Sequence, residues 1–215
     1  MNSFEVKKIN ENVFFLRCNG FGSNISIIKH ESNYFLVDSS AKEFRNDLIE
    51  ILSELNINPS HVKYIFNTHE HYDHIGNSII FNKSINYMSK NTPKDITKFS
   101  LGYDFETHPF SIKRVDEGSY FGFDLYLTPG HSSSGITLVY DNLLFCGDTL
   151  FEKGIARTDF INSSKKELLS SLKKLKKITS SIDKKILVLP GHGDIFYLEN
   201  HINNSINYLK GSINK

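Results

Sequence analysis

The segment THEHYDH at residues 68–74 constrains this chain more than any other feature. Its three imidazoles and one carboxylate would repel one another when charged, and they have little reason to meet without a metal ion. In an extended loop, His69 and His71 point the same way because they are two residues apart. Asp73 and His74 follow where the chain is predicted to turn into a helix, so they can face a neighbouring position. Since imidazole and carboxylate groups suit Zn, Mn or Fe, the segment predicts a metal site.

Three further candidate ligands stand in polar loops that directly follow predicted strands. They are His131 in TPGHSSSG, Asp148 in FCGDT and His192 in LPGHG. Glycines beside them allow sharp turns at strand ends. The other histidines have no such setting and are interpreted as ordinary surface or core residues: His30, His61, His108 and His201.

Composition indicates an ordinary globular chain. Of its 215 residues, 39% are hydrophobic and 23% charged, and the net charge is +1, so no global field attracts nucleic acid or membrane. We expect a single domain over residues 1–215, without a signal peptide or membrane span, in the cytoplasm. Cys18 and Cys146 do not resemble a disulfide framework.

The hydrophobic pattern alternates strands with helices. Short β-branched and aromatic runs predict strands over 4–38, 62–67, 110–148 and 185–190. Helical spacing predicts helices at 43–55 and 164–178, a helix that begins at Gly76, and a helical tail at 196–210. Ser164 and Glu167 are expected to form a capping box. Two β-sheets packed face to face with helices outside would bury this pattern.

In this order and at these separations, THEHYDH, PGHSSSG, GDT and PGHG resemble the metallo-β-lactamase superfamily. The chain is most similar to its short, single-domain glyoxalase II-like (hydroxyacylglutathione hydrolase-like) metallohydrolases. The resemblance implies an α/β (α+β) fold, a four-layer αββα sandwich of two mixed β-sheets flanked by helices. It also implies two divalent metal ions, zinc above all, with iron or manganese as alternatives. By the family pattern, the first ion is held by His69, His71 and His131, the second by Asp73, His74 and His192, and both by Asp148.

A hydroxide that bridges the two metal ions is then the expected nucleophile, because metal binding lowers the pKa of water. Asp73 is the candidate catalytic residue that orients this hydroxide. Arg157 and Tyr72 are candidate substrate-binding residues. Arg157 either binds the carboxylate of an anionic substrate or forms a structural ion pair with Asp159. Asp38 either forms a hydrogen bond with a ligand histidine or is an ordinary turn aspartate. Phe151, Phe160 and Tyr197 are aromatic residues near the motifs that would line a pocket or pack in the core.

The resemblance narrows the reaction. Asp148 argues against β-lactam hydrolysis, because true β-lactamases of this fold usually have cysteine or serine at that position. The stretch GDTLFEKGIARTDF resembles glyoxalase II-like thioesterases and persulfide dioxygenases. We therefore predict a metal-dependent hydrolase of a thioester or related small acyl ester.

Several alternatives stay open. The first is a mononuclear iron persulfide dioxygenase that uses His69, His131 and Asp148. A phosphodiesterase or nuclease, prompted by lysine pairs over 165–185, and a lactonase rank lower, and a non-catalytic binding module is disfavoured because no ligand is missing. The expected partner is a small anionic acyl substrate, with no nucleic acid and no membrane, and a homodimer is the expected oligomer.

Overall fold

The computed structural model describes residues 3–96, 112–199 and 201–213, and these form two compact units. Unit 1 comprises residues 1–88 and 92–115, and unit 2 comprises 89–91 and 116–215. Each unit contains one mixed β-sheet flanked by helices, which confirms the predicted α/β (α+β) class. A single domain over 1–215 stays a prediction. No helix in the described part of the chain is both long and apolar enough to cross a membrane.

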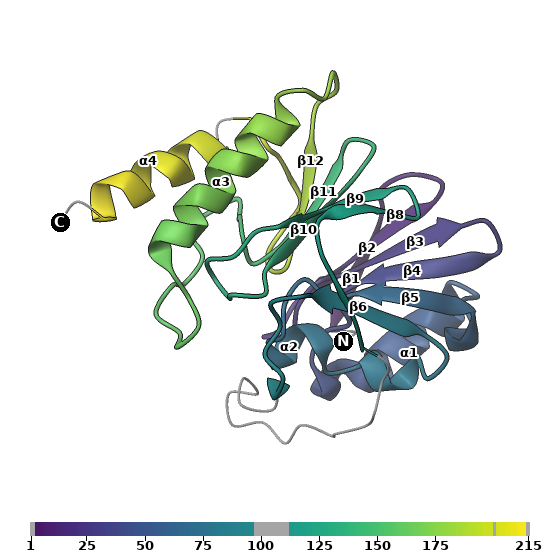
Figure 1. Cartoon of the computed structure of the whole chain (residues 1–215). Helices are drawn as coiled ribbons and strands as arrows, with labels where there is room; N and C mark the ends of the chain where they lie inside the picture. The colour runs from purple at the N-terminus through teal and green to yellow at the C-terminus, as the bar shows by residue number, and fades with distance from the viewer. Residues whose placement is uncertain (1–2, 97–111, 200, 214–215) are drawn as a thin grey trace. The chain divides into compact units, whose positions relative to one another are not determined.

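The sheet of unit 1 has seven strands in chain order (Figure 1). Strands β1 to β4 form an antiparallel meander, whereas β4, β5 and β6 are parallel neighbours. The strands are β1 (Phe4–Lys8), β2 (Val13–Cys18), β3 (Ile25–His30), β4 (Asn33–Val37), β5 (Val62–Phe66), β6 (Ile85–Ser89) and β7 (Ile112–Val115). The helical segments are η1 (Lys42–Phe44), α1 (Arg45–Glu54), η2 (Pro59–His61), α2 (Tyr72–Ile75) and η3 (Ser78–Ile80).

Helix α1 packs on the sheet of unit 1 through one apolar face. Leu48, Ile51 and Leu52 recur at the spacing of that face and are at most 1% exposed. They join a cluster of buried side chains from β2, β3, β4 and β5. This packing confirms the helix predicted over 43–55, although residues 43 and 44 belong to the 3₁₀ turn η1 that precedes α1.

The sheet of unit 2 has six strands in the order β13-β12-β11-β10-β9-β8. Its strands are antiparallel except for the parallel pair β11 and β12. They are β8 (Gly118–Tyr120), β9 (Phe123–Leu127), β10 (Ile136–Tyr140), β11 (Leu143–Gly147), β12 (Leu187–Pro190) and β13 (Phe196–Tyr197). Helices α3 (Lys165–Thr179) and α4 (His201–Ile213) lie side by side, as Figure 1 shows, and share an apolar cluster with β10, β11 and β12.

Three local predictions are corrected. The helix predicted from Gly76 is wrong, because α2 already ends at Ile75 and only a 3₁₀ turn follows. The buried Asn77 side chain donates instead to the carbonyl oxygen of Ala41 (2.7 Å) and accepts from Arg45 (3.3 Å). These tertiary hydrogen bonds compete with continued helix.

The tail predicted as helical over 196–210 begins as strand β13, which pairs with β12 before α4 starts. Only half of the predicted capping box forms. The Ser164 hydroxyl accepts from the backbone N–H of Glu167 (3.3 Å), but the backbone N–H of Ser164 donates to the carbonyl oxygen of Gly130 (2.7 Å). The start of α3 is thereby attached to the loop that carries His131.

Candidate metal centre

Four candidate ligands lie in one continuous segment of unit 1: His69, His71, Asp73 and His74. This segment follows β5, and Asp38 follows the parallel neighbour β4. Because the carboxyl ends of parallel strands meet at one edge of a sheet, the two segments come together there. The three histidines are at most 4% exposed, with His74 at 0%.

Asp38 organises this segment through three hydrogen bonds. It accepts from the backbone N–H of Thr68 (2.7 Å), from the Thr68 hydroxyl (2.8 Å) and from Nδ1 of His74 (2.8 Å). Asp38 has φ of 59°, a left-handed conformation that aspartate tolerates better than most residues and that strained functional sites often contain. Of the two roles predicted for Asp38, the hydrogen bond to a candidate ligand histidine is the one observed.

These hydrogen bonds also decide which ring nitrogens are available to a metal ion. The Thr68 hydroxyl donates to Asp38, so it accepts from Nδ1 of His69 at 3.1 Å. With Nδ1–H of His69 and of His74 engaged in this way, Nε2 of each neutral ring carries the lone pair that can bind a metal ion. These hydrogen bonds therefore make Nε2 of His69 and Nε2 of His74 the candidate metal-binding atoms.

Three candidate ligands lie at strand ends in unit 2. Asp148 follows β11 and His192 follows its parallel neighbour β12, with Gly191 N–H bonded to the Gly147 carbonyl oxygen at 2.8 Å. His131 follows β9, which runs in the same direction as β11 because both are antiparallel to β10. All three loops consequently leave the same edge of the sheet.

Asp148 lies between the two histidines of unit 2. One of its carboxylate oxygens, Oδ2, lies 3.5 Å from Nε2 of His131 and 3.6 Å from Nε2 of His192. The Nδ1–H of His131 donates to the backbone carbonyl oxygen of Arg157 (2.9 Å), which again leaves Nε2 as the donor atom. The side chain of His192 is 32% exposed, compared with 10% for His131.

The loop that carries His131 depends on a glycine. Gly130 has φ of 148°, and a Cβ there would lie 2.4 Å from Cα of Leu168 in α3. Only a residue without a side chain fits between β9 and the first turn of α3. Phe160 packs its ring edge-on against His131, with the centroids 5.3 Å apart.

The donor atoms within each unit fit a metal ion. In a tetrahedral site with Zn–N bonds of about 2.05 Å, neighbouring donors are roughly 3.3 Å apart. In unit 1, Nε2 of His69 and Nδ1 of His71 are 2.9 Å apart, and Nε2 of His74 and Oδ2 of Asp73 are 3.7 Å apart. The pairs in unit 2, at 3.5 and 3.6 Å, are slightly longer than this value. Neutral imidazoles and carboxylates are also the donor chemistry that zinc, iron and manganese accept.

The two candidate substrate-binding residues lie in different settings. The Arg157 guanidinium forms two hydrogen bonds with Asp159, at 3.0 and 2.8 Å, and stacks over the ring of Phe160. This pairing raises the pKa of Arg157 and lowers the pKa of Asp159. The Arg157 side chain is 67% exposed and thus accessible to a ligand that displaces Asp159.

Tyr72 is 2% exposed, and its hydroxyl donates to the carboxylate of Glu43 (2.7 Å). Burial, and then the neighbouring Glu43, raise its pKa. This placement favours a structural role in unit 1 over substrate contact.

A pocket of ≈ 330 Å³ adjoins His192 within unit 2. It is lined by Phe151, Glu152, Lys153, His192, Gly193 and Asp194. Phe151, one of the aromatic candidates, does line it. Glu152 was not among the predicted site residues, because an isolated acidic residue four positions after Asp148 carries no sequence signal of its own.

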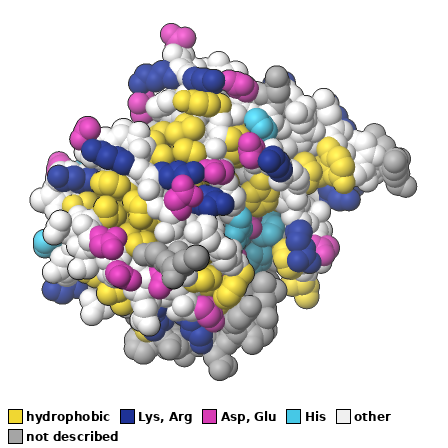
Figure 2. All heavy atoms as spheres, turned by 180° about the vertical axis from the view of Figure 1, so that it is seen from behind, with side chains coloured by type: hydrophobic (Ala, Val, Ile, Leu, Met, Phe, Trp, Pro, Cys, Tyr) yellow, Lys and Arg dark blue, Asp and Glu magenta, His cyan; other side chains and the backbone are white. Residues whose placement is uncertain are grey.

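The lysine pairs over 165–185 do not form a purely cationic surface. Lys174 pairs with Glu117, Lys184 with Asp141 and Lys185 with Glu199. On the face that Figure 2 shows, basic and acidic side chains interleave. This arrangement does not favour the nuclease alternative, which needs a basic surface to track phosphates.

Comparison with known proteins identifies relatives along most of the chain. Residues 18–192 match the family model described as the metallo-beta-lactamase superfamily. A probable metallo-hydrolase of Methanocaldococcus jannaschii is 33% identical over 168 residues, which cover 76% of this chain and 73% of the relative. Hydroxyacylglutathione hydrolase GloC of Haemophilus influenzae is 26% identical over 204 residues, covering 85% of this chain and 91% of that protein.

Solved structures share the fold. A protein crystallised in a di-iron-bound form superposes with a TM-score of 0.68 at 24% identity and covers 82% of this chain and 90% of its own. The B3 metallo-beta-lactamase BLEG-1 superposes with a TM-score of 0.69 at 22% identity, covering 88% of this chain and 95% of its own. At these identities the likeness establishes the fold alone.

Proposed function

Because the chain belongs to the metallo-beta-lactamase superfamily, we propose that it is a hydrolase with two divalent metal ions that cleaves a thioester or related small acyl ester. In this proposal the ligand groups of the two units act together. His69, His71 and His131 hold one ion, and Asp73, His74 and His192 hold the other. Asp148 belongs to both, and zinc is the proposed metal.

The position of Asp148 is the observation that carries the proposal. A single carboxylate oxygen lies at nearly equal distances, 3.5 and 3.6 Å, from Nε2 of His131 and Nε2 of His192. The superfamily pattern assigns these two histidines to different ions. A carboxylate oxygen placed between them suits a ligand that bridges two cations.

The chemistry follows from the donor set. Two cations held by these residues would supply a hydroxide at neutral pH and would polarise the carbonyl oxygen of an ester or thioester. The chain's own residues position the reactants: Asp73, whose side chain is 21% exposed, accepts a hydrogen bond from the attacking water and orients it. Asp38 holds the ring of His74 in one orientation through the 2.8 Å hydrogen bond at Nδ1.

The thioester substrate class is supported by relatives and by the sequence after Asp148. Hydroxyacylglutathione hydrolases of Haemophilus influenzae and Vibrio vulnificus are 26% and 27% identical to this chain and align over 85% and 86% of it. Their name describes removal of an acyl group from glutathione, which is a thiol. We propose a small acyl substrate whose carboxylate takes the place of Asp159 at Arg157.

Metal content and turnover test this function together. Protein purified without added metal is analysed by elemental mass spectrometry and assayed with a panel of acyl thioesters, esters and lactones. Close to two zinc ions per chain with thioester turnover is the expected result. One iron per chain, with oxygen uptake on a persulfide and no thioester turnover, would replace the proposal with the dioxygenase. Two metal ions without turnover of any thioester or ester would reject the substrate class.

A further inference from the structure

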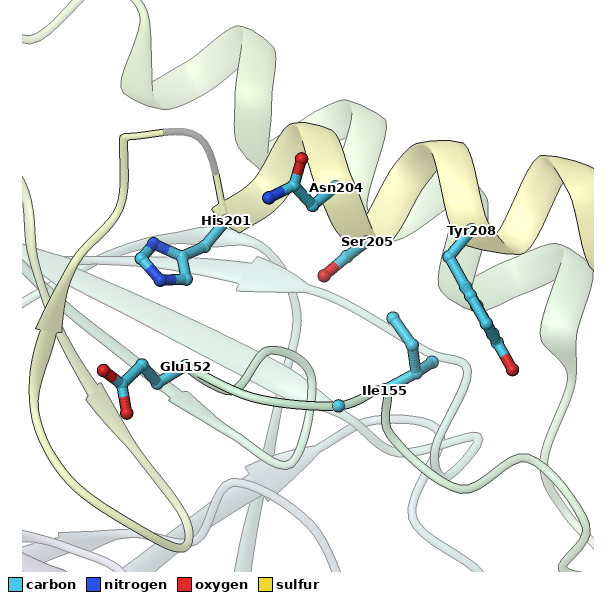
Figure 3. Close-up of a pocket in the computed structure, with 7 residues that line it drawn as sticks. Glu152, Ile155, His201, Asn204, Ser205 and Tyr208 are labelled. Atoms are coloured by element: carbon cyan, nitrogen blue, oxygen red, sulfur yellow. The ribbon is translucent and has the colours of Figure 1, made fainter.

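A second pocket in unit 2, with a volume of ≈ 460 Å³, lies between helix α4 and the segment that follows Asp148 (Figure 3). It is lined by Glu152, Gly154, Ile155, His201, Asn204, Ser205 and Tyr208. The volume is within the range of small-molecule sites. Gly154 adds open space, since a Cβ at this residue would meet no atom within 4 Å.

One end of the pocket accepts hydrogen bonds. Figure 3 shows the Glu152 carboxylate and the His201 ring at the same end. Nδ1–H of His201 donates to the backbone carbonyl oxygen of Tyr197 (3.1 Å), so Nε2 of the neutral ring is an acceptor. The His201 ring also packs against Phe196, with the centroids 4.9 Å apart, which fixes its orientation. From its sequence context alone, His201 is interpreted as an ordinary surface or core residue.

The other end of the pocket is apolar. Ile155 and the ring of Tyr208 lie there, and Tyr208 is 64% exposed. Asn204 and Ser205 offer neutral hydrogen-bonding groups from α4 between the two ends. Neither lysine nor arginine lines the pocket. A carboxylate or phosphate would therefore find no cation here, whereas a positively charged donor would find Glu152 and His201.

We propose that this pocket binds the non-reacting end of the substrate and that this end carries an ammonium group on an apolar body. Glu152 also lines the pocket that adjoins His192, so a substrate cleaved near His192 can extend past Glu152 to Tyr208. The ammonium group donates to the Glu152 carboxylate and to Nε2 of His201, and its apolar body lies against Ile155 and Tyr208. The assignment to substrate rests on the proposed hydrolase function, but the binding of ammonium does not.

Binding of two simple probes tests the site without any turnover. Phenethylammonium and 3-phenylpropionate have the same ring and similar length but opposite charge, and their dissociation constants are measured by calorimetry on the full chain. Phenethylammonium is expected to bind, and Glu152→Gln is expected to weaken it about ten-fold, since a charge-assisted hydrogen bond is lost. Glu50→Gln, an exposed charge removal on α1, is the matched control and should leave the constant unchanged.

A second variant addresses the apolar end. Tyr208→Ala, at an exposed helix position, should weaken phenethylammonium more than methylammonium. Three results would overturn the proposal. They are equal affinity for phenethylammonium and 3-phenylpropionate, no binding of phenethylammonium, or the same loss of phenethylammonium affinity in Glu50→Gln as in Glu152→Gln.

Kinetics then test the link to the substrate. Two thioesters that differ only in an ammonium or a hydroxyl at the tail are compared by the ratio of their kcat/KM values. The ratio should favour ammonium and fall toward one in Glu152→Gln. A ratio of one in the unmodified protein would reject the substrate assignment. If no thioester is turned over, the hydrolase function fails, and the calorimetric result still decides whether ammonium binds.

Discussion

The two units supply metal ligands in opposite ways. Unit 1 presents His69, His71, Asp73 and His74 from one short segment, buried to at most 4% exposure at its histidines and braced by the side chain of Asp38. Unit 2 collects His131, Asp148 and His192 from three strand ends, with His192 32% exposed and His131 held by a backbone carbonyl. The first group depends on local sequence and one side chain, whereas the second depends on strand order and close packing.

Metal removal tests whether the ligand groups of the two units hold metal. We expect a chelator to abolish hydrolysis and added zinc or manganese to restore it. A metal present at 1,000 times its dissociation constant stabilises the fold by about 4.1 kcal/mol, so the chelator should lower Tm by roughly 8–16 °C. Differential scanning calorimetry with and without chelator measures this shift. An unchanged Tm, with activity retained, would mean that neither group holds metal.

Two glycine substitutions compare packing with backbone strain in unit 2. Gly130→Ala places a Cβ 2.4 Å from Cα of Leu168 and should destabilise the chain by about 3 kcal/mol, through overpacking and the disfavoured φ. Gly193 has φ of 80°, but a Cβ added there would meet no atom within 4 Å. Gly193→Ala should therefore cost only about 1 kcal/mol of stability, through backbone strain. Urea unfolding provides both free energies. Equal losses would show that the contact with Leu168 is unimportant.

Asp38→Asn tests the hydrogen bonds that Asp38 accepts in unit 1. Asparagine has nearly the same side-chain shape as aspartate and tolerates the left-handed φ of 59°. The amide cannot accept from Thr68 and from His74 as the carboxylate does. Metal affinity should fall about 10- to 100-fold, measured by competition with a chromophoric chelator. Thr68→Ser keeps the hydroxyl and serves as the control. An affinity as low in Thr68→Ser as in Asp38→Asn would assign the loss to packing.

Arg157→Ala is the corresponding test in unit 2. The hydrogen bond from His131 goes to the backbone carbonyl of Arg157, which alanine retains, so metal affinity should change by less than about three-fold. If Arg157 binds substrate, KM for anionic acyl thioesters rises while metal content stays constant. A loss of metal comparable to that in Asp38→Asn would contradict the distinction between side-chain and backbone bracing.

The smallest effect concerns the ion pair of Arg157 with Asp159. The hydrogen bond from Arg157 lowers the pKa of Asp159 in the folded chain. Its stabilising contribution is therefore present above the unfolded pKa of about 4 and is lost as pH falls through the folded value. The difference in Tm between the unmodified chain and Asp159→Asn should be small near pH 6 and vanish in more acidic solution. A Tm difference that grows as the pH falls would contradict the lowered pKa of Asp159.

Local pattern was sufficient for some elements and failed for others. The amphipathic spacing of Leu168, Leu172 and Leu175 predicts α3 correctly, because the repeat that defines its apolar face lies entirely within the helix. The helix predicted from Gly76 failed because Asn77 bonds to Ala41, a contact that is invisible in the local pattern. Residues 196–197 were predicted as helix from the spacing of apolar residues along the chain. They form strand β13 instead, because they pair with β12.

By itself, the sequence determined the ligand chemistry and the superfamily. His69, His71, Asp73 and His74 stand within one turn-forming segment, so their proximity needs no long-range contact. Only the tertiary structure decided that Asp148 lies between His131 and His192 and that Glu152 and His201 share a pocket. These relations join residues on different elements, and the direction and order of the strands fix them through hydrogen bonds and packing that spacing along the chain does not encode.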